Sequence, residues 1–271
     1  MLIRCLSVLA LCVSSALPLW AVERLPEAKK LPERGISAHR GENGVFPENT
    51  IAGFVEAVRL GAAQVEFDVR HTKDGVAIIM HDVTVDRTTN GTGRVIDLTF
   101  DEIRALDAGI KKSERFAETK VPTLEEALDC LPRNIWINVH VYTDNPLDVA
   151  RIIIEKDRQH QAFMAIRRVG ALAVKEKYPQ ILICNMERRG DDISRYIRET
   201  IEWGNEFIQL LRLGTPEEMR ALRDAGVRIN FCCLQTPARL RELVEAGVDF
   251  PLVDNMSVFV EPAKEIFGRK P

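Results

Sequence analysis

Short β-type segments alternate with amphipathic helical segments along most of the chain, and this alternation constrains the fold more than any other feature. Eight segments predict strands: 35–38, 64–69, 135–141, 162–166, 181–184, 207–211, 227–232 and 249–253. Seven amphipathic segments predict helices: 50–60, 123–130, 145–156, 169–177, 191–202, 215–225 and 237–246. Strands that alternate strictly with helices predict an α/β protein, a parallel (β/α)8 TIM barrel.

The predicted helices carry clear start and stop signals. Thr123 with Glu126, and Thr215 with Glu218, form capping-box patterns at helix starts, and Gly61 is a C-terminal stop. An open doubly wound sheet is the alternative architecture. It usually has a glycine-rich phosphate loop after its first strand, and this sequence has none there.

The amino-terminal segment predicts export. In residues 1–21, Arg4 precedes an apolar run, and Ala21 is a plausible cleavage position for a signal peptide. The run is shorter than the ~20 apolar residues of a membrane span, so we expect no stable span after signal removal. An uncleaved anchor is the alternative. Residues 22–35 predict a linker, and residues 36–271 predict one barrel domain that is periplasmic or secreted.

Composition excludes some classes of partner. A net charge of −3 leaves no basic surplus, so we expect no nucleic-acid binding. Four cysteines would remain after signal removal, and they lie in apolar runs where buried thiols are common. Their spacing has no zinc pattern, and it predicts neither disulfides nor an oligomeric state.

One connection, from residue 70 to residue 122, is far longer than a βα loop requires. It contains a predicted short strand at 76–80, then His81 and Asp82, and then a polar segment at 86–93. Long loops in compact domains tend to be functional, and in a barrel this insertion after the second strand would sit over the C-terminal mouth.

Glu66 and Asp68 are the first candidate site residues. They lie on one predicted strand with one residue between them, so both side chains point to the same face. Val65, Phe67 and Val69 would face the helices, which leaves the carboxylates facing the barrel interior. Two carboxylates this close repel, and a cation between them would relieve the repulsion. The alternative is a solvated strand end with ordinary salt bridges.

His39, Arg40 and His81 are candidates for phosphate chemistry. The guanidinium group of Arg40 can bind a phosphate in a bidentate way. Two histidines near one phosphate can divide proton transfer, one accepting from the nucleophile and one donating to the leaving oxygen. His71 is expected to be an exposed loop residue, and His160 is expected at the surface.

The segment Pro47-Glu48-Asn49-Thr50 predicts a helix start, with Asn49 or Thr50 as the cap. Helix capping alone explains this pattern. Glu48 can equally orient Arg40 or His39 by contacting that side chain without touching the substrate.

These motifs together resemble those of the glycerophosphodiester phosphodiesterase family, whose barrel is related to phosphatidylinositol phospholipase C. The matching segments, in order, are His39-Arg40-Gly41, Pro47-Glu48-Asn49-Thr50, Glu66-x-Asp68, Thr72-x-Asp74-Gly75, His81-Asp82, Arg87-Thr88-Thr89-x-Gly91-x-Gly93 and Val121-Pro122-Thr123-Leu124-Glu125-Glu126. The resemblance implies one divalent metal ion, Ca²⁺ or Mg²⁺, held by Glu66 and Asp68. It also implies that His39 and His81 are the acid/base pair and that Arg40 holds phosphate.

The third barrel strand departs from the family pattern, which usually has a Glu that completes the metal site and a Lys that meets the phosphate. His140 and Tyr142 stand in their places. We predict His140 as the third metal ligand, which makes Mn²⁺ or Zn²⁺ possible, because imidazole suits such ions. The alternative is that His140 only hydrogen-bonds phosphate. Tyr142 is predicted to contact phosphate without adding a positive charge.

The resemblance implies an exported, metal-dependent hydrolase that converts glycerophosphodiesters to glycerol 3-phosphate and an alcohol. The nucleophile can be water or a substrate hydroxyl next to the phosphate, and the alcohol head group stays open. One alternative is a phosphodiesterase that acts on another lipid or sugar phosphodiester. Another is a non-catalytic binding barrel, which only the missing Lys supports.

Overall fold

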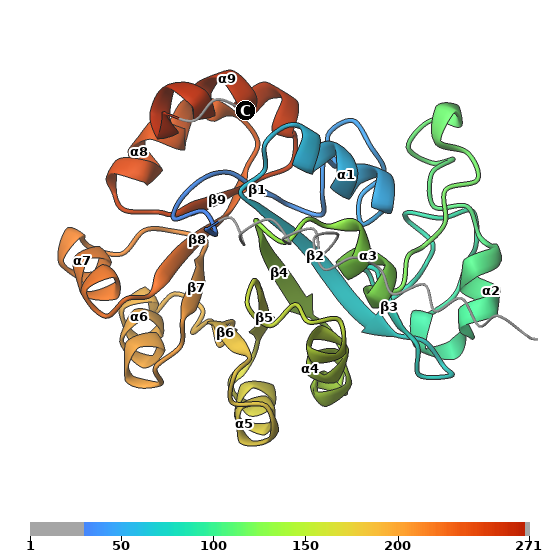
Figure 1. The fold of residues 1–271 in the computed structure, drawn as a ribbon, viewed down its shortest axis with the longest axis horizontal. Coiled ribbons are helices and arrows are strands. Elements are labelled where there is room, and N and C mark those ends of the chain that lie inside the picture. Colours follow the sequence, from blue (N-terminus) through green and yellow to red (C-terminus); the bar gives the residue numbers. More distant parts are fainter. Residues whose placement is uncertain (1–29, 269–271) are drawn as a thin grey trace, which may run out of the picture.

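The computed structural model describes residues 30–268, in which eight parallel strands close into a barrel surrounded by helices (Figure 1). The barrel strands are β1 (Ser37–Ala38), β2 (Gln64–His71), β4 (Trp136–Val141), β5 (Ala162–Ile166), β6 (Leu182–Asn185), β7 (Phe207–Leu210), β8 (Arg228–Leu234) and β9 (Phe250–Val253). Strand β1 pairs with both β9 and β2, and these pairings close the barrel. The predicted TIM barrel is confirmed. The predicted signal peptide, 1–21, lies outside the described residues.

The helices follow the strands on the outside of the barrel (Figure 1). They are α1 (Ile51–Arg59), α2 (Phe100–Ala105), α3 (Leu124–Cys130), α4 (Pro146–Glu155), α5 (Arg168–Lys177), α6 (Ile193–Glu202), α7 (Pro216–Asp224), α8 (Leu240–Glu245) and α9 (Met256–Phe267). All seven predicted helices are present. The last of them is split, because its first turn is a 3₁₀ turn at Pro237–Arg239. No predicted segment corresponds to α2 or α9.

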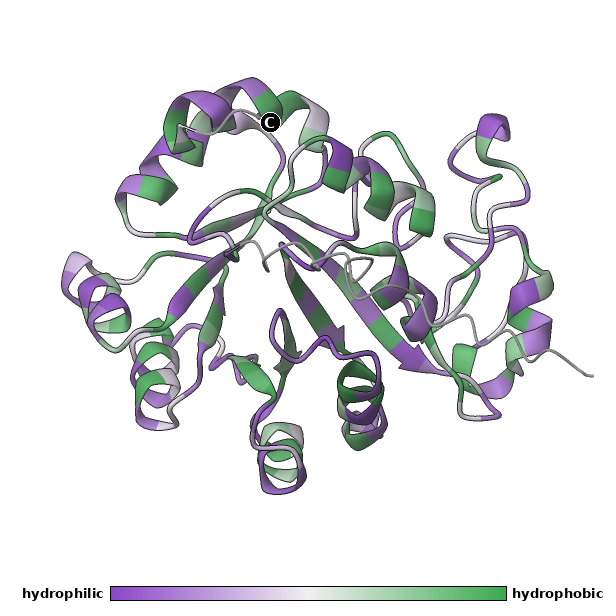
Figure 2. Ribbon diagram, viewed as in Figure 1, coloured by the Kyte–Doolittle hydropathy of each residue, from purple (hydrophilic) through white to green (hydrophobic). Residues whose placement is uncertain are grey.

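Side-chain alternation divides the barrel into an outer apolar layer and a filled interior. Val65, Phe67 and Val69 of β2 are fully buried against the surrounding helices, as predicted. Figure 2 shows the same alternation as hydrophilic and hydrophobic bands along β2. The opposite face of β2 therefore points its polar side chains into the barrel.

The interior changes from apolar to charged along the barrel axis. At the amino-terminal end, the rings of Phe163 and Phe207 stack at 3.8 Å, and Trp136 packs edge-on against Phe207. Amide side chains above them pair across the barrel, with Asn138 donating to Gln209 at 3.2 Å. The charged residues lie above these amides, at the carboxyl ends of the strands, where barrel active sites are found.

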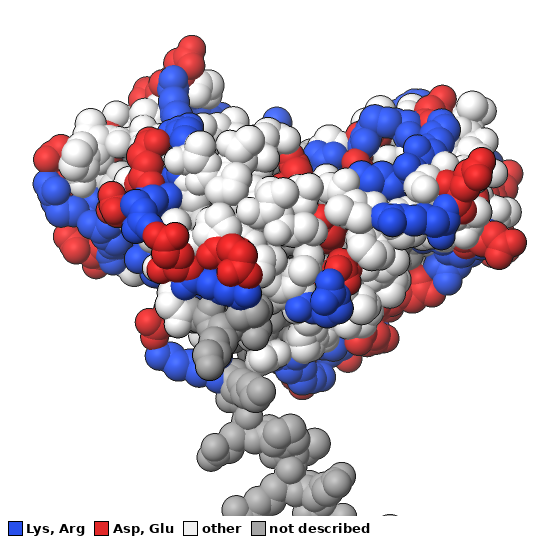
Figure 3. Space-filling model, turned by 90° about the horizontal axis from the view of Figure 1, so that it is seen from above, with Lys and Arg blue, Asp and Glu red and all other residues white. Residues whose placement is uncertain are grey.

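The long insertion forms a separate small layer beside β2 (Figure 1). Its strand β3 (Ala77–Ile79) pairs antiparallel with β2, which confirms the predicted short strand. It has its own apolar cluster, which includes Ile78, Val95 and Ile103. The insertion thus extends the barrel wall at the carboxyl end of β2. In the face seen in Figure 3 it forms the right-hand lobe, where lysine and arginine side chains gather.

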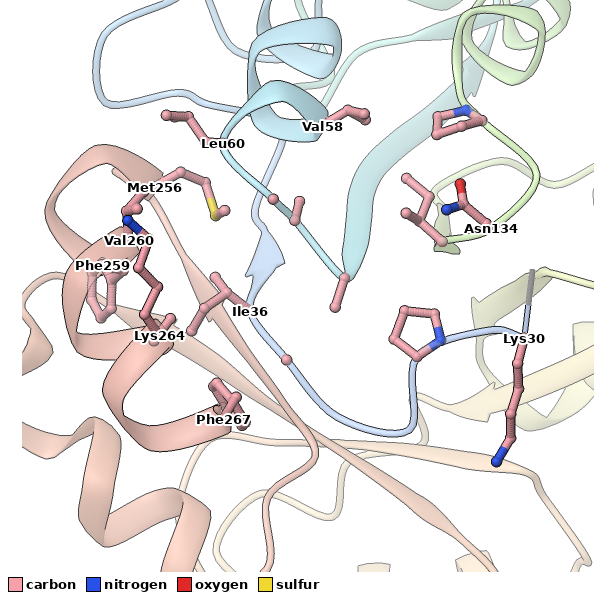
Figure 4. A pocket seen from close by; sticks show the side chains of 18 residues that line it. Lys30, Ile36, Val58, Leu60, Asn134, Met256, Phe259, Val260, Lys264 and Phe267 are labelled. Atoms are coloured by element: carbon pink, nitrogen blue, oxygen red, sulfur yellow. The ribbon is translucent and has the colours of Figure 1, made fainter. Parts of the chain in front are cut away.

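The amino-terminal end of the barrel is closed by the chain that enters β1. Trp136 donates its indole hydrogen to the carbonyl oxygen of Pro32 at 2.8 Å, and Leu31 packs against the same cluster. A cavity of about 390 Å³ lies beside this segment, between α1 and α9, and its lining is mostly apolar (Figure 4). Within residues 30–268, no helix is long and apolar enough to cross a bilayer.

Candidate active site

The loop after β1 brings two predicted site residues over the barrel mouth. Arg40 adopts a left-handed backbone conformation with φ of 57°, which is uncommon for a residue other than glycine. This conformation points its backbone N–H at the carboxylate of Glu66, which accepts a hydrogen bond at 2.9 Å. Strained backbone of this kind tends to occur at functional sites. Here it ties the His39–Arg40 loop directly to β2.

Glu66, Asp68 and His140 converge at the mouth. The register of β2 and β4 sets Asp68 opposite His140. Nδ1 of His140 lies 3.7 Å from Oε1 of Glu66 and 3.6 Å from Oδ1 of Asp68. Both carboxylates are almost completely buried. The inward orientation predicted for His140 is therefore observed.

The donor set of these three residues fits a divalent metal ion. Their ligand atoms all lie within 4.8 Å of one another. Atoms bound to one ion at roughly 2.0–2.4 Å are about 3–3.5 Å apart, so only a small contraction is needed. Oδ1 of Asp68 is buried and has no hydrogen-bond partner among the described residues. A cation bound at this position would supply the partner that this carboxylate oxygen lacks.

The charges of this trio are unbalanced without a cation. Burial and the neighbouring Glu66 carboxylate raise the pKa of Asp68. Burial acts in the same direction on Glu66, but its contact with His140 and the charge of His39 outweigh it and lower the pKa of Glu66. One carboxylate is thus held ionised at the cost of the other, and a cation between them would let both ionise.

His39 is oriented by a residue from the far end of the chain. Its Nδ1 lies 2.6 Å from Oδ1 of Asp254, and its Nε2 lies 4.0 Å from Oε2 of Glu66. Burial lowers the pKa of His39, but the hydrogen bond to Asp254 and the charge of Glu66 outweigh it, so the pKa is raised overall. A histidine held through Nδ1 by a carboxylate presents its other nitrogen in a fixed direction.

Arg40 is fixed between two carboxylates. Its guanidinium group donates to Glu48 at 3.0 Å and lies 3.4 Å from Oδ2 of Asp68. Asn49 donates to the same Asp68 oxygen at 2.8 Å, while Thr50 caps α1. Of the two predicted functions for Glu48, contact with Arg40 is observed. Contact with His39 is not seen in the described structure.

Arg87 links the insertion to this loop. It donates to Glu48 at 2.7 and 2.8 Å and to Asp82 at 2.6 and 3.0 Å. Asp82 in turn lies 2.7 Å from Nδ1 of His81. The four charged groups from Arg40 to Asp82 therefore form a continuous chain that ends on His81, so Arg87 sets the position of His81 relative to Arg40.

Tyr142 lies between His140 and His81. Its ring centroid is 4.2 Å from that of His140 and 5.4 Å, edge-on, from that of His81. Burial and the charges of Asp68 and Glu66 raise the pKa of Tyr142 to about 12, so its hydroxyl stays protonated and can donate to a phosphate oxygen. Arg70 packs over the same ring and donates to the backbone oxygen of His81 at 2.9 Å.

The structure brings the predicted site residues together and corrects two expectations. His71, expected in an exposed loop, is the buried last residue of β2, where Thr143 and Asp148 contact its two ring nitrogens. His160 is exposed, as predicted.

The second correction concerns cysteines. Cys232 and Cys233, for which no pairing was predicted, are joined by a disulfide close to His39.

Two important residues carried no predicted function. The sequence patterns assign nothing to Asp254, and they include Arg87 only as part of a matching motif. The signal for Asp254 was its place directly after the last strand, which neighbours β1 in a closed barrel. No sequence signal indicates that Arg87 would bridge Glu48 and Asp82.

Comparison with known sequences agrees with this geometry. The family model described as "Glycerophosphoryl diester phosphodiesterase family" matches residues 39–199, more than half of the chain. A glycerophosphodiester phosphodiesterase of Caldanaerobacter subterraneus subsp. tengcongensis is 49% identical over 107 residues. That match covers 39% of this chain and 44% of the relative, so the chain spans less than half the length of that relative.

Solved structures share the whole barrel. The crystal structure of a glycerophosphodiester phosphodiesterase from Agrobacterium tumefaciens superposes with a TM-score of 0.74 at 29% identity, covering 84% of this chain and 99% of that one. An Oleispira antarctica phosphodiesterase in complex with the product sn-glycerol-3-phosphate has a TM-score of 0.74 at 21% identity, covering 85% of this chain and 96% of that one. At that identity the second likeness concerns the fold alone.

Proposed function

The chain belongs to the glycerophosphoryl diester phosphodiesterase family, and on that premise we propose that it hydrolyses glycerophosphodiesters to glycerol 3-phosphate and an alcohol. The observation that carries this proposal is the convergence of His39, Arg40, Glu66, Asp68 and His140 at the barrel mouth. The family membership confirms the predicted resemblance, and its enzyme class is the predicted one, a phosphoric diester hydrolase.

The proposed enzyme depends on one divalent metal ion, held by Glu66, Asp68 and His140. When bound, the ion would neutralise phosphate charge and so stabilise the charge that develops on the phosphate oxygens. The orphaned Oδ1 of Asp68 supports this assignment. The imidazole ligand makes the site less anionic than three carboxylates would, which favours manganese or zinc over calcium.

His39 and His81 are proposed as the acid/base pair, on opposite sides of the phosphate. Asp254 and Asp82 contact their respective Nδ1 atoms, so in each histidine Nε2 is the nitrogen left for proton transfer. One Nε2 accepts the proton of the nucleophile, which is water or a substrate hydroxyl, and the other donates a proton to the leaving oxygen. The raised pKa of His39 suits the donating function.

Arg40 is proposed to hold the phosphate. Glu48 and Asp68 contact only part of its guanidinium fork, and the group is charged at any physiological pH. Tyr142 would add one hydrogen bond from its protonated hydroxyl. Binding of this kind positions the phosphorus atom between the two histidines before reaction.

Export to the periplasm or to the cell exterior is part of the proposal, supported by the apolar run in residues 1–21. A non-catalytic binding barrel is the alternative. It is disfavoured because both histidines keep oriented carboxylate partners, which binding alone does not require.

A panel of glycerophosphodiesters tests the function. The purified chain is incubated with each diester, with and without chelator, and glycerol 3-phosphate is measured. We expect product with at least one diester, loss of product with chelator, and product formation at least about 100-fold slower in the His39→Ala variant. The His160→Ala variant is the matched control, since His160 is exposed and lies away from the site. Product release by His39→Ala at the wild-type rate would rule out the assignment.

A further inference from the structure

A second, larger space opens from the active site at the carboxyl ends of β4, β5 and β6. It is a cleft of about 890 Å³, and His140 and Tyr142 form one end of its lining. From there it extends past the start of α4 to the start of α5. Because it begins at the two side chains nearest the proposed phosphate position, it lies where one half of a phosphodiester would extend.

Two arginines of this cleft have no carboxylate partner among the described residues. Arg167 and Arg188 line it, both are exposed, and no described carboxylate forms an ion pair with either. Many other arginines of the described chain, such as Arg195, are paired.

The acidic groups of the cleft leave part of this charge uncompensated. Glu187 is occupied, because it accepts a hydrogen bond from the backbone N–H of Arg168 at 3.1 Å and lies 3.6 Å from Arg189. Asp144 is exposed and supplies one negative charge. The two positive charges of Arg167 and Arg188 therefore exceed by one the negative charge that is free to compensate them. Helices α4 and α5 both begin here, and their amide ends add partial positive charge.

We propose that this cleft binds the alcohol half of the substrate, and that the preferred alcohol carries a phosphomonoester group, which Arg167 and Arg188 recognise. Two guanidinium groups match the two charges and several acceptor oxygens of a phosphomonoester. This proposal rests on the proposed function and adds the substrate class. It makes Arg167 and Arg188 determinants of specificity.

The same lining disfavours a quaternary ammonium head group. Recognition of such cations relies on the faces of several aromatic rings. Tyr142 is the one aromatic side chain in the described lining of the cleft, and the His140 ring and Arg70 already occupy its surroundings. Two unpaired arginines would in addition repel the cation.

A matched pair of substrates tests the proposal: glycerophosphoinositol and glycerophosphoinositol 4-phosphate, which differ by one phosphomonoester. We expect wild type to show about tenfold or greater kcat/KM for the phosphorylated diester, with a preference that falls as salt rises. In the Arg167→Met/Arg188→Met variant, kcat/KM should fall about tenfold for the phosphorylated diester and change less than about twofold for the other. The Arg195→Met variant, paired on α6 away from the cleft, should behave as wild type. Equal kcat/KM for the two diesters in wild type would overturn the proposal.

A binding measurement separates this inference from the proposed function. Calorimetric titration with inositol 4-phosphate, the released alcohol, requires no turnover. Binding by wild type, with an affinity about tenfold lower in the double variant, supports the subsite even if no diester is cleaved, and then only the proposed function fails. Absent binding, or equal affinity in both proteins, overturns the subsite.

Discussion

Replacing Arg87 by methionine should impair catalysis through His81, although Arg87 itself need not touch the substrate. Methionine keeps much of the side-chain length and removes all four hydrogen bonds to Glu48 and Asp82. Asp82 would then lose the partner that fixes it beside His81. The imidazole of His81 stays in the protein, but its orientation is no longer set relative to Arg40.

The size of the effect can be estimated from the contacts. Hydrogen bonds to charged groups contribute about 1.5–3 kcal/mol. The Arg87 side chain is 48% exposed, so solvent screening reduces this, and we expect a loss of about 1–2 kcal/mol in the free energy of unfolding. Complete loss of a general acid or base costs about 10²–10⁴ in rate. Misorientation of a histidine that is still present should lower kcat by less, about 10–100-fold.

The stability loss should depend on pH. The hydrogen bond from Arg87, opposed by burial and aided by His81, holds the pKa of Asp82 well below its usual value near 3.9. A carboxylate with a depressed pKa stabilises the fold above its unfolded-state pKa, and this contribution is lost as pH falls further. The difference in the free energy of unfolding between wild type and the variant should therefore be fully present at pH 7 and smaller near pH 3.

Arg104 provides the control for this experiment. It also belongs to the insertion and binds Glu126 through two hydrogen bonds, but that pair anchors α2 to α3 away from His81. Steady-state kinetics and denaturant titrations would be run on both methionine variants. Arg104→Met should lose similar stability and keep kcat within about twofold of wild type. An unchanged kcat in Arg87→Met, or an equal loss of kcat in both variants, would refute the assignment of Arg87 to positioning His81.

Three further outcomes are expected. His39→Ala and His81→Ala should each lower kcat by about 10²–10⁴, and near-normal turnover in either would refute its assignment to proton transfer. Asp254→Asn should remove the interaction that raises the pKa of His39, so the limb of the pH–rate profile set by His39 should move to lower pH; an unmoved limb would contradict this. His140→Glu should shift the ranking of activating ions towards calcium and magnesium, whereas an identical ranking would count against metal ligation.

The metal trio shows what sequence reasoning could reach. Alternation along β2 and β4 was enough to predict that Glu66, Asp68 and His140 face the interior. Parallel pairing then brings residues at the same level together, because each strand has a fixed neighbour. Local patterns and fold topology therefore decide these positions, and both can be read from the sequence.

Contacts between distant segments could not be predicted in the same way. Asn255 is the N-cap residue of helix α9, but its side chain makes no capping hydrogen bond. The backbone N–H of Met256, the first residue of the helix, instead donates to the buried carboxylate of Glu42, which is far away in the sequence. His71 was misjudged for a similar reason, since its partners come from the loop after β4 and from α4. Capping and burial supplied by distant residues leave no local pattern.

The central claim is that Glu66, Asp68 and His140 hold one ion on which turnover depends. The most direct test titrates chelator-treated protein with a divalent ion while following both bound metal and glycerol 3-phosphate release. We predict that turnover rises in proportion to occupancy and saturates at about one ion per chain, and that Glu66→Ala/Asp68→Ala neither binds the ion nor turns over substrate. Full turnover by the metal-free protein, or normal metal affinity in the double variant, would contradict the account.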